Sequence, residues 1–121
     1  GTIYVAPGGK HMLVEKTGSA VVIRLSDGPP EHFCKPAVDP MLRSLAGVYR
    51  AGLLAAIFTG MGRDGAEGCV AVANAGGSFI AQDEATSVVY GMPAAAMKTG
   101  RAMAQLSLDD AAEYLTRCMG A

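Results

Sequence analysis

One turn of this sequence carries the residues best suited to chemistry. It reads Phe58-Thr59-Gly60-Met61-Gly62-Arg63-Asp64-Gly65-Ala66, and it lies where an apolar run ends and a helical pattern begins. Closely spaced glycines allow the backbone to turn sharply and to approach another group. Unpaired N–H groups at the start of a helix favour negative charge. A carboxylate here, Asp64, can therefore cap a helix, or it can orient a catalytic imidazole and stabilise its charged form.

Three interpretations of the turn compete. In the first, Asp64 caps the following helix and the glycines make a tight connection. In the second, the segment from Gly60 to Gly65 is a dinucleotide-binding G-x-G-x-x-G pattern, with Asp83 and Glu84 downstream as ribose ligands. A carboxylate just before the third glycine would repel a pyrophosphate, which counts against this reading. In the third, Asp64 is the acidic member of a hydrolase triad. Spacing alone leaves all three open.

The first part of the chain is predicted to form strands. Apolar runs at residues 3–6, 12–15 and 20–25 are separated by glycine-containing turns, which predicts a small antiparallel β-meander. The spacing of apolar residues changes from that of strands to that of a helix at Asp39, which precedes a proline. Asp39 is predicted to cap the helix that begins there, because its carboxylate can accept from free N–H groups and proline suits the first helical position.

The remainder alternates strand and helix. The predicted strands are residues 53–59, 78–82 and 103–106, and the predicted helices are residues 66–75, 92–98 and 108–118. This order predicts an α/β fold with a doubly wound, mainly parallel sheet and helices on both faces. Ligands bind at the carboxyl ends of the strands in such sheets, and the turn that contains Asp64 follows the first of these strands.

Composition excludes several classes of partner. The chain has 121 residues, a formal net charge of −1 and only 10 basic residues. Without a run of Lys or Arg, nucleic acid is disfavoured as a partner. No apolar stretch approaches the roughly 20 residues of a membrane span, so no membrane insertion is expected. The three cysteines are widely spaced and form no C-x-x-C pair, which favours a reducing, cytoplasmic location.

The two histidines are predicted to be structural. His11 is interpreted as an exposed or partly packed strand residue. His32 lies two residues from Cys34, and an extended segment would place both on one face without building a triad. A metal site needs three or four converging ligands, so no metal is expected. Asp83 and Glu84 are interpreted as ordinary loop charges.

A series of short motifs extends the argument beyond one turn. They are Ile-Tyr-Val-Ala-Pro-Gly from residue 3, His11-Met12, Asp-Gly-Pro-Pro from residue 27, Pro-x-Val-Asp from residue 36, Thr-Gly-Met-Gly-x-Asp-Gly from residue 59, Ala-Gln-Asp-Glu from residue 81 and Val-x-Gly-Met-Pro from residue 89. In this order they resemble the C-terminal two-thirds of the catalytic domain of the chemotaxis protein-glutamate methylesterases (CheB type). Thr-Gly-Met-Gly-x-Asp-Gly is the most specific of these motifs, and Gly-Met-Pro is the next most specific.

The resemblance implies a function for the turn. In that family the Asp of this motif is the triad acid, which assigns the role to Asp64, and the backbone N–H of Met61 helps bind the oxyanion. The family's serine and histidine lie upstream of the first residue here. Residues 1–121 are thus expected to form a partial catalytic domain that is inactive alone.

The intact enzyme, by resemblance, hydrolyses glutamyl methyl esters on methyl-accepting chemotaxis receptors and deamidates glutamines there, without a cofactor. An upstream phosphorylatable receiver domain would control access to the site. The alternatives are a nucleotide- or dinucleotide-binding α/β module and a non-catalytic interaction domain. An isolated part of the sheet would expose an apolar edge, so the chain alone is expected to self-associate.

Overall fold

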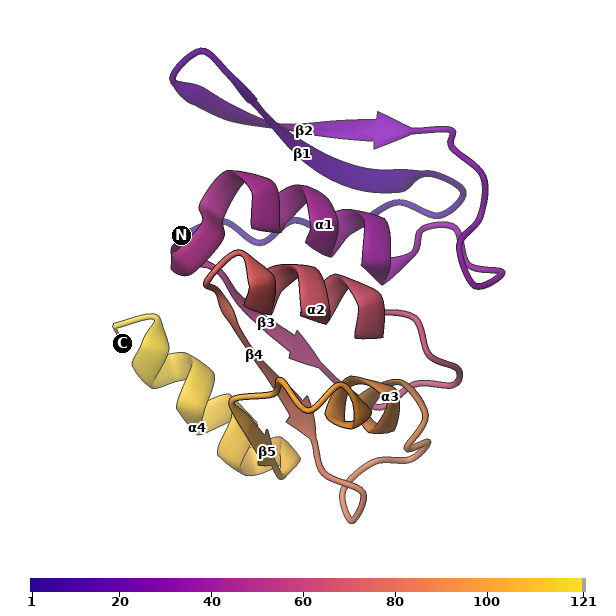
Figure 1. Ribbon diagram of the computed structural model, residues 1–121, viewed down its shortest axis with the longest axis vertical. Coiled ribbons are helices and arrows are strands. Elements are labelled where there is room, and N and C mark those ends of the chain that lie inside the picture. The colour runs from indigo at the N-terminus through magenta and orange to yellow at the C-terminus, as the bar shows by residue number, and fades with distance from the viewer. Residues whose placement is uncertain (121) are drawn as a thin grey trace.

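The computed structural model describes residues 1–120, which form an N-terminal β-hairpin and a C-terminal α/β layer structure (Figure 1). Strands β1 (His11–Thr17) and β2 (Ala20–Ser26) pair antiparallel, with His11 opposite Ser26. The hairpin lies on helix α1 (Val38–Tyr49), and Val14 N donates to Ser44 Oγ at 3.1 Å. A short helical turn, η1 (Arg50–Gly52), then leads into the sheet.

The predicted third strand of the meander, at residues 3–6, is wrong. These residues form no strand in the described chain, and Ile3 and Val5 are 91% and 85% exposed. A strand is stabilised by backbone hydrogen bonds to a neighbouring strand as well as by its own apolar residues. The segment has the composition of a strand, but the hairpin consists of β1 and β2 alone.

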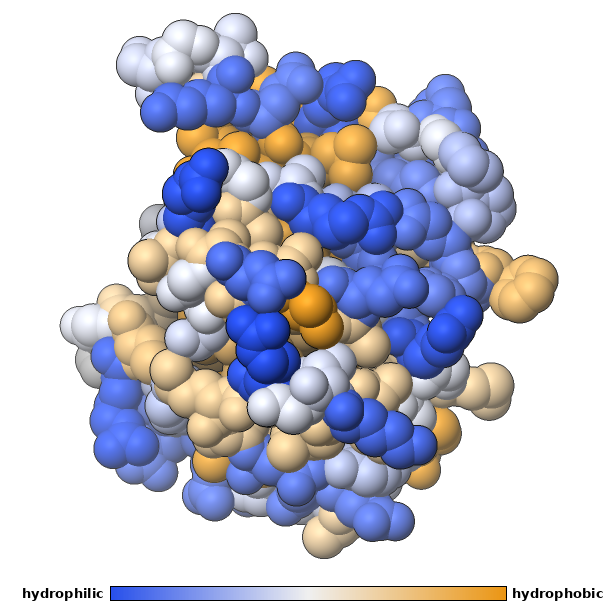
Figure 2. All heavy atoms as spheres, in the orientation of Figure 1, coloured by the Kyte–Doolittle hydropathy of each residue, from blue (hydrophilic) through white to orange (hydrophobic). Residues whose placement is uncertain are grey.

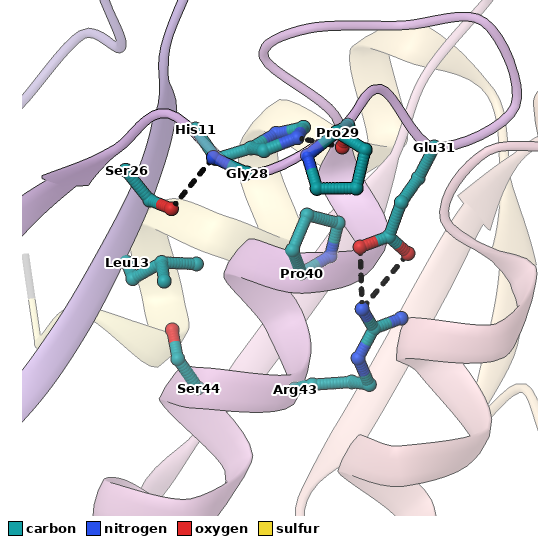
Figure 3. A pocket seen from close by; sticks show the side chains of 9 residues that line it. All are labelled: His11, Leu13, Ser26, Gly28, Pro29, Glu31, Pro40, Arg43 and Ser44. Atoms are coloured by element: carbon teal, nitrogen blue, oxygen red, sulfur yellow. Dashed lines mark hydrogen bonds and ion pairs between the residues drawn. The ribbon is translucent and has the colours of Figure 1, made fainter.

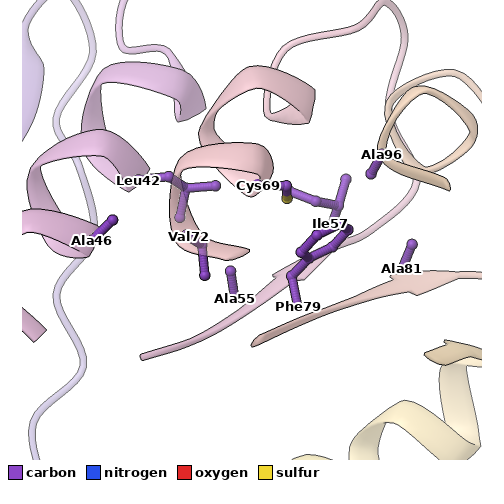
Figure 4. Packing of buried hydrophobic residues seen from close by; sticks show 9 residues of the cluster. All are labelled: Leu42, Ala46, Ala55, Ile57, Cys69, Val72, Phe79, Ala81 and Ala96. Carbon is purple, nitrogen blue, oxygen red and sulfur yellow. The ribbon is translucent and has the colours of Figure 1, made fainter. Parts of the chain in front are cut away.

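The second part is a parallel sheet with strand order β3-β4-β5. Its strands are β3 (Leu54–Ile57), β4 (Ser78–Gln82) and β5 (Ala104–Leu106), and its helices are α2 (Ala66–Asn74), α3 (Met92–Lys98) and α4 (Leu108–Cys118). Helices α2 and α3 cover one face, with α1 packed beside α2, and α4 covers the other face (Figures 1 and 4). The predicted fold class is confirmed.

The main core lies between the sheet and the helices α1, α2 and α3 (Figure 4). Phe79 of β4 is fully buried, and it packs in one cluster with Ile57 of β3 and Val72 of α2. The core therefore supports β3 and β4, whose carboxyl ends lead into the turn that contains Asp64 and the loop that begins at Asp83.

The outer edge of β3 has no partner strand among residues 1–120, since β3 pairs only with β4. An apolar groove of about 300 Å³ runs beside β3, between it and residues of α1 such as Met41 and Leu45. In the part of the chain that the structure describes, no helix is both long enough and apolar enough to cross a bilayer.

Candidate active site

The turn at residues 59–65 connects β3 to α2 at the carboxyl end of the parallel strands, where the sequence predicted it. A second segment holds it in place. Thr59 Oγ1 accepts from Val89 N at 2.8 Å and donates to Val89 O at 3.1 Å, and Gly60 O accepts from Met92 N at 2.8 Å. The two most specific motifs of the sequence, Thr-Gly-Met-Gly-x-Asp-Gly and Gly-Met-Pro, thus lie against each other.

Close backbone approach explains Gly91, the first residue of the Gly-Met-Pro motif. A Cβ at Gly91 would lie 2.7 Å from Gly60 O and 2.9 Å from Gly62 N. Backbone atoms cannot move aside as a flexible side chain can, so this packing requires glycine.

Asp64 caps a helix, but not the following helix that the first interpretation named. Its side chain lies just before α2, yet Oδ2 accepts from Val38 N at 2.7 Å and Oδ1 accepts from Asp39 N at 3.0 Å, at the start of α1. Asp64 is only 5% exposed. Both carboxylate oxygens are therefore held by main-chain donors, which fixes the orientation of the group.

Asp39 makes the reciprocal contact, and its predicted role as the cap of its own helix is wrong. The N-cap of α1 is Ala37, and Asp39 lies inside the first turn. Its Oδ1 instead accepts from Gly65 N at 2.9 Å and from Gly68 N at 2.7 Å, at the start of α2. Local spacing showed that Asp39 could cap a helix, but only the packing of α1 against α2 decided which helix it caps.

The His32 ring contacts one of these two carboxylates, that of Asp39. Its Nε2 lies 2.8 Å from Asp39 Oδ2 and 3.7 Å from Glu67 Oε2. One ligand atom each from His32, Asp39 and Asp64 lies within 4.8 Å of the others. The carboxylate oxygens of this group already accept main-chain or imidazole hydrogen bonds, so the arrangement is better suited to fixing side chains than to holding a cation.

His11 is buried at 3% exposure, which corrects the prediction of an exposed or partly packed residue. Ala37 N donates to Nδ1 at 3.2 Å, so Nε2 carries the proton and donates to Pro29 O at 2.8 Å. With both ring nitrogens engaged by backbone groups, His11 connects the hairpin to the segment before α1. Its role is structural.

A cleft of about 450 Å³ lies beside His11, between the hairpin and α1 (Figure 3). At its mouth Arg43 Nη2 donates to Glu31 Oε2 at 2.7 Å, and this bond raises the pKa of Arg43. Gly28 N donates to Ser26 Oγ at 3.1 Å. These polar groups are paired with one another, and neither Asp64 nor Met61 lines the cleft.

Met61 lies at the surface of the turn, with 83% of the residue exposed. Among the hydrogen bonds within residues 1–120, the Met61 N–H has no acceptor. Its predicted part in binding an oxyanion stays a prediction.

Asp83 stabilises the loop in which it lies, because its Oδ1 accepts from Thr86 N at 3.0 Å. Glu84 is exposed. Gln82, which is 2% exposed, was not among the predicted site residues. Gln82 Oε1 accepts from Thr59 N at 2.7 Å, and Nε2 donates to Thr86 O at 2.9 Å, so this side chain connects the two loops at the site. A polar residue at the end of a buried strand was the available signal.

Comparisons with known proteins agree on one family. The model of the CheB methylesterase family matches residues 1–115. A protein-glutamate methylesterase/protein-glutamine glutaminase of Paramagnetospirillum magneticum is 53% identical over 97% of this chain, and one of Azospirillum brasilense is 51% identical over 97%. The chain spans 31% and 30% of the length of these two relatives.

Structural similarity supports the same assignment. The CheB methylesterase catalytic domain of Thermotoga maritima has a TM-score of 0.84 and 36% identity, over 86% of this chain and 55% of that one. A match of this extent shows the same fold. This chain therefore belongs to the CheB methylesterase family.

Proposed function

We propose that this chain is the C-terminal part of the catalytic domain of a protein-glutamate methylesterase and glutaminase, with Asp64 as the acid of a Ser–His–Asp triad. The observation that carries the proposal is a carboxylate fixed by two main-chain donors at the carboxyl end of a parallel sheet. A carboxylate has about four lone-pair positions, so two bound N–H groups leave acceptor capacity for an imidazole. The serine and the histidine would come from residues outside 1–121.

The chemistry would be acyl transfer. The serine hydroxyl attacks the ester carbonyl of a glutamyl methyl ester while the histidine takes its proton, and Asp64 holds the imidazole in the useful tautomer. The Met61 N–H donates to the oxyanion that develops on the carbonyl oxygen. The histidine gives this proton to the leaving methoxide oxygen, which departs as methanol, or to the leaving amide nitrogen of a glutamine, which departs as ammonia. Water then hydrolyses the acyl-enzyme by the same route.

The substrates would be methyl-accepting chemotaxis receptors. The relatives are named as enzymes of both glutamate esters and glutamines, which supports the two activities. A phosphorylatable receiver domain upstream would regulate access to the site. The chain by itself would be inactive, because Asp64 and Met61 orient and stabilise but do not attack.

The test is Asp64→Asn in the full-length polypeptide that carries this chain. We expect ester cleavage to fall by roughly 10³ to 10⁴ in kcat, because an amide in place of the carboxylate favours the wrong tautomer of the imidazole. Asp109→Asn is the matched control, since Asp109 is an exposed residue in the first turn of α4. Undiminished ester cleavage in the Asp64→Asn variant would remove the triad role.

The nucleotide-binding alternative receives less support from the geometry. A pyrophosphate at the start of α2 needs free main-chain N–H groups. Asp39 already accepts from Gly65 N and Gly68 N there, and it would repel the phosphates. A ligand present at 100 times its dissociation constant would stabilise the fold by about 2.7 kcal/mol. We expect NAD or ATP to leave the melting temperature unchanged.

A further inference from the structure

The starts of helices α1 and α2 are connected by two exchanged carboxylates. Asp39 belongs to α1 and accepts from the first N–H groups of α2, whereas Asp64 precedes α2 and accepts from the first N–H groups of α1. The exchange holds the two helix starts together, because each carboxylate can reach its donors only while the helices are packed side by side.

Asp39 is the more deeply buried member of the pair, with 0% exposure compared with 5% for Asp64. A buried carboxylate is costly unless it is paired and hydrogen-bonded. Three donors meet it here: two amides at 2.9 Å and 2.7 Å on Oδ1, and the His32 ring at 2.8 Å on Oδ2. In the hydrolase mechanism proposed above, Asp39 has no role, so this fully satisfied charge remains to be explained.

We propose that Asp39 is a positioning residue for Asp64, an inference that rests on the proposed function. Asp39 acts on its neighbour in two ways. Its backbone N–H donates to Asp64 Oδ1 at 3.0 Å, and its carboxylate binds the N–H of Gly65, the residue that directly follows Asp64. One residue thus fixes both the acceptor atom of Asp64 and the backbone from which that side chain projects.

His32 supports Asp39 from a strained turn. Residues 31 and 34 are joined by backbone hydrogen bonds of 3.1 Å and 2.8 Å, and the two residues between them, His32 and Phe33, have φ values of 51° and 64°. Left-handed backbone is unfavourable for residues other than glycine. The turn places the His32 ring on Asp39 Oδ2, whereas the Phe33 side chain lies fully in solvent.

A positioning role for Asp39 predicts an effect on turnover that is separate from any effect on stability. Misplacement of a catalytic group by about 1 Å can cost on the order of 10²-fold in rate. Without the Asp39 side chain, the N–H groups of Gly65 and Gly68 lose their acceptor, and the turn that carries Asp64 is free to shift. A residue that only stabilises the fold would lower the melting temperature and leave the turnover of the folded enzyme unchanged.

The experiment compares Asp39→Ala, Asp39→Asn and Asp64→Asn in the full-length polypeptide, with Asp109→Asn as the control. Turnover of a glutamyl methyl ester is measured well below the melting temperature of each variant. We expect Asp39→Ala to lower kcat at least about tenfold with KM unchanged. Asp39→Asn should stay within about threefold of the wild type, because its amide oxygen still accepts from Gly65 and Gly68 and its NH₂ group can donate to His32 Nε2 in the other neutral tautomer of the ring. If Asp39→Ala does not fold, Asp39→Ser replaces it with the same expectation.

Wild-type kcat in folded Asp39→Ala or Asp39→Ser, alongside an inactive Asp64→Asn, overturns the positioning role and leaves the triad intact. An equal loss in Asp39→Asn and Asp39→Ala also overturns it, since the retained acceptor then makes no difference. Full activity in Asp64→Asn instead overturns the triad role, and the positioning role with it.

Discussion

The hairpin and the parallel sheet are built from similar apolar residues, but they bury them to very different extents. In β2, Val22 and Leu25 are 40% and 48% exposed, whereas in β4 Phe79 and Ile80 are 0% and 1% exposed. The sheet has helices on both faces, and the hairpin has only α1 beneath it, so apolar atoms remain visible on the hairpin side of the molecule (Figures 1 and 2). Apolar strands become a core only where two layers cover them.

The largest effect expected from the comparison of the hairpin with the parallel sheet is on self-association of the chain. At micromolar concentrations we expect the 121-residue chain to self-associate, because the unpaired edge of β3 and its apolar groove can accept another strand. Ala56→Lys places a charge on β3 and should shift the population toward monomer, as measured by light scattering. Val22→Lys on the exposed hairpin is the control and should have less effect. A clean monomer from the unmodified chain would contradict the expectation.

The next largest effect is on stability. Phe79→Ala should lower the free energy of unfolding by about 3–5 kcal/mol, because it removes a fully buried ring and leaves a cavity. Val22→Ala should cost less than about 1 kcal/mol, since Val22 is already partly in water. Urea unfolding monitored by circular dichroism measures both. Equal losses in the two variants would show that the hairpin contributes as much as the sheet.

Two glycines allow the same comparison at the level of backbone packing. Gly91→Ala should cost about 1–3 kcal/mol, because the new Cβ meets the backbone of the turn that carries Asp64. Gly47→Ala in α1 should instead stabilise by about 0.5–1 kcal/mol, since an added Cβ meets nothing within 4 Å and alanine favours a helix. Thermal melting of both variants provides the measurement, and destabilisation by Gly47→Ala would contradict the structure.

The last effect is a dependence of stability on alkaline pH. Burial in the core raises the pKa of Cys69 from 9.0 to about 12. Folding therefore favours the protonated thiol: this contribution is fully present below about pH 9 and is lost as the pH rises toward 12. Between about pH 8 and about pH 10.5, the urea midpoint of the wild type should fall more than that of Cys69→Ala. Cys34→Ala, which changes an exposed thiol, should behave like the wild type.

Much of the fold followed from local signals in the sequence. Apolar runs of strand length that alternate with helical patterns predicted the parallel sheet, and the position of Asp64 after the first of these strands predicted its place at the carboxyl end. The hairpin followed from two apolar runs around a glycine turn. These features depend on residues that are close together in the sequence, so spacing and composition were enough to predict them.

Other features depended on which elements pack together. The segment at residues 3–6 has the residues of a strand but no neighbouring strand among those described, and His11 is buried because the segment before α1 folds back onto it.

The exchange between Asp39 and Asp64 joins residues 25 apart, and no spacing rule states which of two nearby helix starts a carboxylate will reach. The residue types alone show that these side chains could accept from main-chain N–H groups. Only the packing of α1 against α2 decided that each would cap the other's helix, because a hydrogen bond requires its two groups to lie within about 3 Å in space, however far apart they are along the chain.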